Sequence, residues 1–95
     1  MHVRWTRPAL IDLDEIQTYV ARESPAAAHK LVHDLFDRTQ NGLAVSPDMG
    51  RLGRVRNTRE LVFADLLYIV AYRITDVVEV LAVVHTARTW PKSFD

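Results

Sequence analysis

Hydrophobic residues between positions 7 and 45 recur at the spacing of two amphipathic helices. The first helix is predicted over residues 7–22, with Thr6 as its N-cap. Ser24-Pro25 starts the second, because serine is a favoured N-cap and proline is tolerated at the first helical position. Its apolar stripe comprises Ala28, Leu31, Val32, Leu35, Phe36, Thr39 and Leu43. The second helix therefore ends between Gly42 and Val45, and the short connection predicts an antiparallel hairpin.

After a turn-forming loop at residues 46–50, the pattern changes from helical to strand-like. Strands are predicted over residues 59–63, 67–74 and 77–85, and residues 2–5 also alternate like a short strand. In the last strand, one face is expected to carry Val78, Val80, Ala82 and Val84, and the other Val77, Leu81 and Val83. The segment between Gly50 and residue 59 is expected to be loop.

The predicted order is strand, helix, helix and then three strands. This order favours a two-layer α+β domain, in which the helical hairpin packs on one face of a small, mostly antiparallel sheet. The 95 residues are expected to form a single domain, and the other sheet face to stay partly open. The chain has no cysteine, no apolar run long enough for a membrane span and no apolar leader segment, so a cytoplasmic protein is expected.

Arginines are concentrated between Gly50 and Glu60. The chain has twelve basic and twelve acidic residues, yet this run alone contains Arg51, Arg54, Arg56 and Arg59. The guanidinium fork suits carboxylate and phosphate groups, so the run is expected to bind an anionic partner, with Trp90 as a further contact. Alternatively, these arginines cap loops and lie along a sheet edge.

His85, at the end of the last predicted strand, is the group best placed for proton transfer. With Arg59, Arg73 and Arg88 to hold phosphate, it could support RNA cleavage. Alternatively, His85 hydrogen-bonds a strand end or the C-terminal segment. His29 and His33 have zinc-binding spacing but lack a third ligand, and no glycine-rich phosphate loop is present. We therefore expect neither a metal nor a cofactor.

Short motifs along nearly the whole chain resemble the RelE/ParE superfamily of bacterial toxins from type II toxin–antitoxin modules. The motifs are Val3-Arg-Trp-Thr-Arg-Pro-Ala9 with Asp12-Leu13, Ser24-Pro25 with Ala28, Pro47-Asp-Met-Gly-Arg51, Thr58-Arg-Glu-Leu61, Tyr68-Ile-Val-Ala-Tyr-Arg73 and Val80-Leu-Ala-Val-Val-His-Thr-Ala-Arg-Thr-Trp-Pro91. The resemblance implies this same fold, and a growth-inhibiting toxin that a cognate antitoxin neutralises.

The superfamily contains two mechanisms. RelE-like members cut mRNA in the ribosome, whereas ParE-like members bind and inhibit DNA gyrase without being nucleases. The Pro47–Arg51 loop and the Arg59-Glu-Leu61 segment resemble the ParE side, and no lysine occurs between Lys30 and Lys92, where RelE-like nucleases usually carry lysines. The resemblance thus implies a non-enzymatic gyrase inhibitor. The alternative is a ribosome-dependent endoribonuclease that uses His85 and the three arginines, so enzymatic activity stays open at this point.

Overall fold

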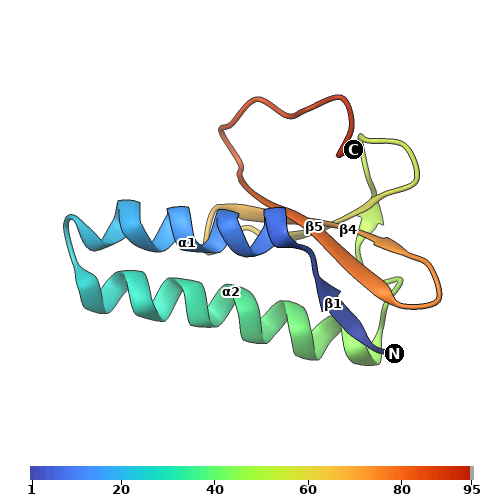
Figure 1. Cartoon of the computed structure of the whole chain (residues 1–95), viewed down its shortest axis with the longest axis horizontal. Helices are drawn as coiled ribbons and strands as arrows, with labels where there is room; N and C mark the ends of the chain where they lie inside the picture. Colours follow the sequence, from blue (N-terminus) through green and yellow to red (C-terminus); the bar gives the residue numbers. More distant parts are fainter. Residues whose placement is uncertain (95) are drawn as a thin grey trace.

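In the computed structural model, which describes residues 1–94, two helices cover one face of a five-stranded sheet (Figure 1). The helices are α1 (Arg7–Ala21) and α2 (Pro25–Val45). The strands are β1 (Val3–Trp5), β2 (Arg51–Leu52), β3 (Arg59–Phe63), β4 (Tyr68–Ile74) and β5 (Val78–His85). They lie in the order β1-β5-β4-β3-β2, in which β1 is parallel to β5 and the other pairs are antiparallel. The predicted α+β architecture is therefore confirmed.

The two predicted helix starts differ in their hydrogen bonds. The Ser24 hydroxyl accepts a bond of 3.1 Å from the backbone N–H of Ala27, as an N-cap should. Thr6 stands at the N-cap position of α1 but makes no side-chain cap. Its hydroxyl instead donates to the Val80 carbonyl at 2.7 Å, so it joins the start of α1 to β5.

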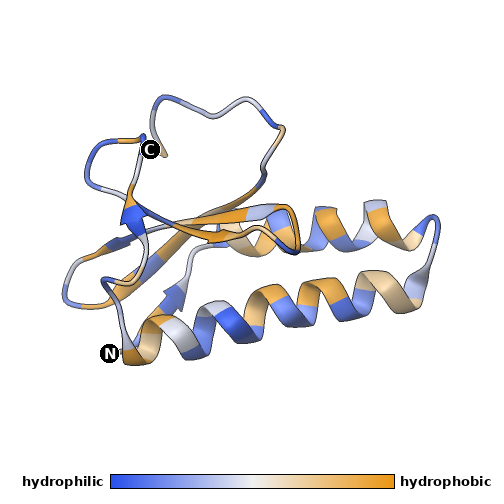
Figure 2. Ribbon diagram, turned by 180° about the vertical axis from the view of Figure 1, so that it is seen from behind, coloured by the Kyte–Doolittle hydropathy of each residue, from blue (hydrophilic) through white to orange (hydrophobic). Residues whose placement is uncertain are grey.

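The main core lies between the helices and the sheet. Its largest fully buried side chains include Tyr72 of β4 and Leu35 and Leu43 of α2. Figure 2 shows the long strands coloured mostly as hydrophobic, while polar positions recur along the outer sides of both helices. Within residues 1–94, neither helix is long and apolar enough to cross a membrane.

The prediction of which β5 residues share a face of the sheet is partly wrong, because β5 contains a β-bulge. Tyr72 pairs with Val80, but the preceding residue of β4, Ala71, pairs with Ala82, so Leu81 is an extra residue. The extra residue reverses the direction of every later side chain. As a result Val80 and Val83 both join the main core, whereas Ala82 moves to the opposite face together with Val84.

The segment after β5 covers part of that opposite face. Trp90 and Phe94 pack against a small cluster of Ala71, Ala82 and Val84. In Figure 1 this segment, coloured red, arches back over the sheet on the side away from the helices. The sheet face that was expected to be open is thus partly covered, and we call this face the tail face.

Strand β2 was not predicted, because it lies in the segment that was expected to be loop. Its two residues are too few to show an alternating pattern.

Candidate functional site

A buried carboxylate holds two of the four clustered arginines. The Glu60 side chain is only 1% exposed and lies on β3. Its Oε1 accepts bonds from Arg51 Nη2 at 2.8 Å and Nε at 3.1 Å. Its Oε2 accepts from Arg54 Nε at 3.0 Å and from the Arg54 backbone N–H at 2.8 Å. The arginine run therefore has an acid of its own, at the position that ends the run in sequence.

The charge state of Glu60 follows from this network. Burial by itself would raise the pKa of its carboxyl group, but the hydrogen bonds from Arg54 and Arg51 outweigh burial and lower the pKa to about 2. The carboxylate is consequently ionised at neutral pH. Each of the two guanidiniums has one edge engaged, while its outer edge remains at the surface.

The other two arginines of the run lie in different surroundings. Arg59 Nη1 donates to the Gly50 carbonyl at 2.8 Å and, more weakly, to the Asp48 carbonyl at 3.3 Å. Arg56 is exposed and makes no hydrogen bond or ion pair with any residue in the described range 1–94. The four arginines therefore do not form one continuous free rim, since the domain itself uses three of them.

Trp90 joins this network through stacking. The guanidinium carbon of Arg54 lies 4.0 Å from the centre of the Trp90 ring, and Phe94 contacts the same ring edge-on. A guanidinium above an indole face is a favourable cation–π arrangement. Trp90, expected to face a partner, is half-buried and connects the C-terminal segment to the loop before β3.

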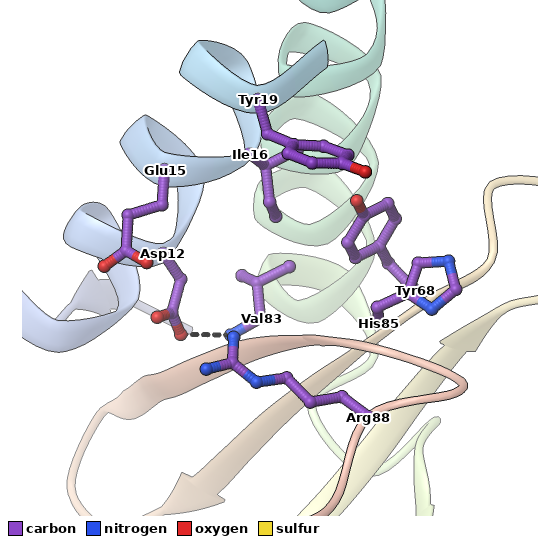
Figure 3. Close-up of a pocket in the computed structure, with 8 residues that line it drawn as sticks. All are labelled: Asp12, Glu15, Ile16, Tyr19, Tyr68, Val83, His85 and Arg88. Atoms are coloured by element: carbon purple, nitrogen blue, oxygen red, sulfur yellow. Dashed lines mark hydrogen bonds between the residues drawn. The ribbon is translucent and has the colours of Figure 1, made fainter.

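His85 lies at a second site, where β5 ends. Its ring meets the Tyr68 ring edge-on at 5.1 Å between centroids, and its Nδ1 accepts a hydrogen bond of 3.1 Å from the Ala87 backbone N–H. This hydrogen bond at the strand end corresponds to the non-catalytic alternative given for His85 in the sequence analysis. His85 and Arg88 line a cavity of about 400 Å³, and Figure 3 shows the side chains around it. The cavity is also lined by Asp12, Glu15, Ile16, Tyr19, Tyr68 and Val83.

Asp12 was not expected at this site. Its carboxylate accepts a hydrogen bond of 2.8 Å from the Val83 backbone N–H and so ties α1 to β5 (Figure 3). Burial raises the pKa of Asp12; the Val83 bond lowers it, nearby Glu15 raises it and Arg88 lowers it, with a net upward shift. In the sequence, Asp12 resembles any other acid in the early turns of a helix, so no local pattern identifies this contact.

The structure brings only one of the three candidate phosphate-binding arginines to His85. His85 pairs across the sheet with Tyr68, at one end of β4, and Arg88 follows three residues later. Arg59 pairs with Tyr72, about 14 Å along the strand from Tyr68, and Arg73 is about 17 Å away. Arg59 and Arg73 are therefore remote from His85.

Arg73 is engaged with a second acid that the sequence analysis did not single out. Its Nε donates to Glu79 Oε1 at 2.8 Å, and Arg4 of β1 pairs with the other oxygen of the same carboxylate. The Glu79 side chain is 9% exposed. In the sequence, the one signal for the buried positions of Glu79 and Glu60 is that each is an acidic residue within a mostly apolar strand.

The histidines of α2 lie side by side, as their spacing implies. The ring centroids of His29 and His33 are 4.1 Å apart on an exposed helix face. Within residues 1–94 no group of three histidine, cysteine or acidic side chains is arranged to hold a metal ion.

Comparison with known proteins identifies similar sequences. Residues 3–90 match the sequence model of the family described as "ParE toxin of type II toxin-antitoxin system, parDE". The chain is 44% identical over 90 residues to a Sinorhizobium fredii (strain NBRC 101917 / NGR234) protein described as "Putative toxin Y4kP", covering 95% of this chain and 93% of that protein.

A solved structure is also similar. It is described as "Chromosomal ParDE TA system from P. aeruginosa" and matches with a TM-score of 0.79 at 27% identity, over 90% of this chain and 95% of that one. The structural similarity, the sequence similarity and the match over residues 3–90 lead to one conclusion: the chain belongs to the ParE toxin family and is the toxin of a type II toxin–antitoxin system, with an antitoxin as its partner.

Proposed function

We propose that this toxin stops growth by binding DNA gyrase, without cleaving RNA, and that its cognate antitoxin blocks that binding in the cytoplasm. The observation that carries the proposal is the separation of His85 from Arg59 and Arg73 along the sheet. RNA cleavage needs a proton acceptor, a cation for the phosphate charge and a proton donor around one phosphate. The four candidate residues are not arranged around one such point.

The charge around His85 also favours a binding role. Two carboxylates, Asp12 and Glu15, line the same cavity as His85 and Arg88. An RNA phosphate entering there would meet two like charges for one guanidinium, which disfavours its binding. The Nδ1 of His85 is already occupied by the Ala87 N–H, so one ring nitrogen is withdrawn from proton transfer.

Exposed apolar side chains on α1 are candidate contacts for the antitoxin. Leu10, Ile11 and Tyr19 are 48%, 45% and 69% exposed, respectively, on a helix whose inner face is already packed on the core. An amphipathic segment of the antitoxin would bury such exposed apolar groups.

The direct test measures gyrase supercoiling and cell-free translation side by side with the purified toxin. We expect inhibition of supercoiling at toxin concentrations that leave translation unchanged, and reversal of that inhibition by the antitoxin. Inhibition of translation alone would overturn the gyrase proposal and support the ribosome-dependent endoribonuclease.

The variant His85→Ala with Arg88→Ala is expected to remain toxic in a growth assay. An endoribonuclease that used these groups would instead lose roughly 10²- to 10⁴-fold in rate, because acid–base groups typically contribute that much. Thermal unfolding of the purified variant checks that its fold is intact. Loss of toxicity in a folded variant would contradict a role by binding alone.

A further inference from the structure

The tail face of the sheet carries six of the twelve basic residues of the chain. Glu60 pairs with Ala71, and Ala71 belongs to the apolar cluster beneath Trp90, so Glu60 points to this face. Arg73 lies two residues beyond Ala71 on β4 and therefore shares the face. The cations placed here by these pairings and contacts are Arg4, Arg51, Arg54, Arg56, Arg73 and Lys92.

Two buried carboxylates, Glu60 and Glu79, form ion pairs with four of these arginines. Glu60 engages the Nε and Nη2 atoms of both Arg51 and Arg54, and within residues 1–94 their Nη1 atoms make no hydrogen bond. Glu79 accepts from Arg73 only at Nε, and it also pairs with Arg4. Each carboxylate thus neutralises one of two charges, and it fixes the guanidiniums with their outer donors directed away from the sheet.

Beside these arginines lies a small cavity with a cationic rim. It has a volume of about 250 Å³ and is bordered by Arg56, Arg73 and Lys92. Its other polar lining comes from Asn57, Thr58 and Ser93, and within the described part of the chain no carboxylate lines it. Within residues 1–94 the Arg56 side chain has no partner, so no residue of that range compensates the positive charge of the rim.

We propose that this face binds the phosphodiester backbone of duplex DNA. The free donors are outer guanidinium edges and one ammonium, which are the groups that contact backbone phosphates. They are spread over β1, β2, β4, the loop before β3 and the C-terminal segment, so an extended polyanion could contact several of them at once. The inference rests on the proposed function in one respect: the DNA would be the duplex on which gyrase acts.

The test is the fluorescence anisotropy of a short labelled DNA duplex titrated with the full chain. The variant Arg56→Gln with Lys92→Gln is compared with Arg22→Gln with Lys30→Gln, which removes the same charge from the helical side. We expect the first double variant to bind DNA roughly tenfold more weakly at about 50 mM salt. We also expect the slope of log K against log salt to become smaller in magnitude by about 1.8. The second double variant should change neither quantity much.

Other outcomes would overturn the inference. Equal weakening by both variant pairs would mean that net charge alone acts, and stronger binding of polyglutamate or of single-stranded RNA would assign the face to another anion. Failure of the wild-type chain to bind the DNA duplex at low salt would also refute the inference. Gyrase assays on the same variants separate the two proposals: DNA binding without gyrase inhibition defeats only the proposed function, and gyrase inhibition without DNA binding defeats only this inference.

Discussion

Replacing Glu60 with glutamine is expected to lower the free energy of unfolding by about 2 kcal/mol at neutral pH. The carboxylate is almost fully buried and accepts hydrogen bonds from two guanidiniums, and these bonds lower its pKa from 4.5 to about 2. A shift of this size corresponds to about 3 kcal/mol, and solvent around the half-exposed arginines reduces the net effect. Urea denaturation of both proteins measures the difference.

The pH dependence gives a sharper form of this prediction. The pKa of Glu60 is lower in the folded protein than in the unfolded chain, so its contribution is complete above about pH 4.5 and is lost as the pH falls toward 2. The difference between wild type and Glu60→Gln should therefore shrink across that interval and vanish at its acid end. A difference that stays constant with pH would show that shape, and not charge, makes Glu60 important.

Asp65→Asn is the matched control. Asp65 also pairs with an arginine, Arg38, at 2.8 Å, and this bond lowers its pKa. Its side chain is 61% exposed, however, and exposed ion pairs contribute little to stability. We expect a much smaller effect than at Glu60, and comparable losses at both positions would contradict the role assigned to burial.

The second large effect is expected at Gly50, where alanine should destabilise the fold by about 3 kcal/mol. A Cβ atom there would lie 2.6 Å from the Tyr72 hydroxyl and 2.9 Å from the Glu60 backbone carbonyl, and neither can move freely. The Gly50 N–H also donates to the Tyr72 hydroxyl at 2.8 Å. Overpacking together with a strained buried hydrogen bond accounts for the magnitude.

Gly42→Ala provides the comparison for this substitution. Gly42 lies inside α2, and its added Cβ would meet only the flexible Met49 side chain, at 3.2 Å. Alanine favours a helix over glycine by about 1 kcal/mol, so Gly42→Ala should be neutral or stabilising. Thermal unfolding of both variants distinguishes them, and similar losses at the two positions would refute the steric argument.

Local sequence signals were enough to predict the order of elements and several boundaries. Ser24-Pro25 places the start of α2 correctly, and the alternation over residues 59–63 gives β3 with both of its ends. These features depend on contacts between residues close in the chain. The bulge at Leu81 could not be predicted, because β4 determines the partner of each β5 residue and neither strand alone carries that information.

In the candidate sites, too, contacts between residues close in the chain could be predicted, and contacts that depend on strand pairing could not. The sequence identifies the arginine run as a charged cluster, yet Glu60 reaches Arg51 and Arg54 only when β2 folds against β3. His85 and Arg88 are neighbours in the chain and remain neighbours in the structure. Arg59 and Arg73 were grouped with His85 because the three residues fall on adjacent predicted strands. The sheet register, which the strand pattern does not reveal, separates them along those strands.

The parallel pairing of β1 with β5 has a consequence for how the toxin is made. Val3 lies beside Val78, so the first strand to leave the ribosome must wait for the last before it gains a neighbour in the sheet. At ordinary elongation rates this wait lasts several seconds, during which the helical hairpin can form but the sheet stays incomplete. The sheet of the toxin is thus completed only after β5 has been synthesised, and an antitoxin already present in the cell can bind the toxin from that time on.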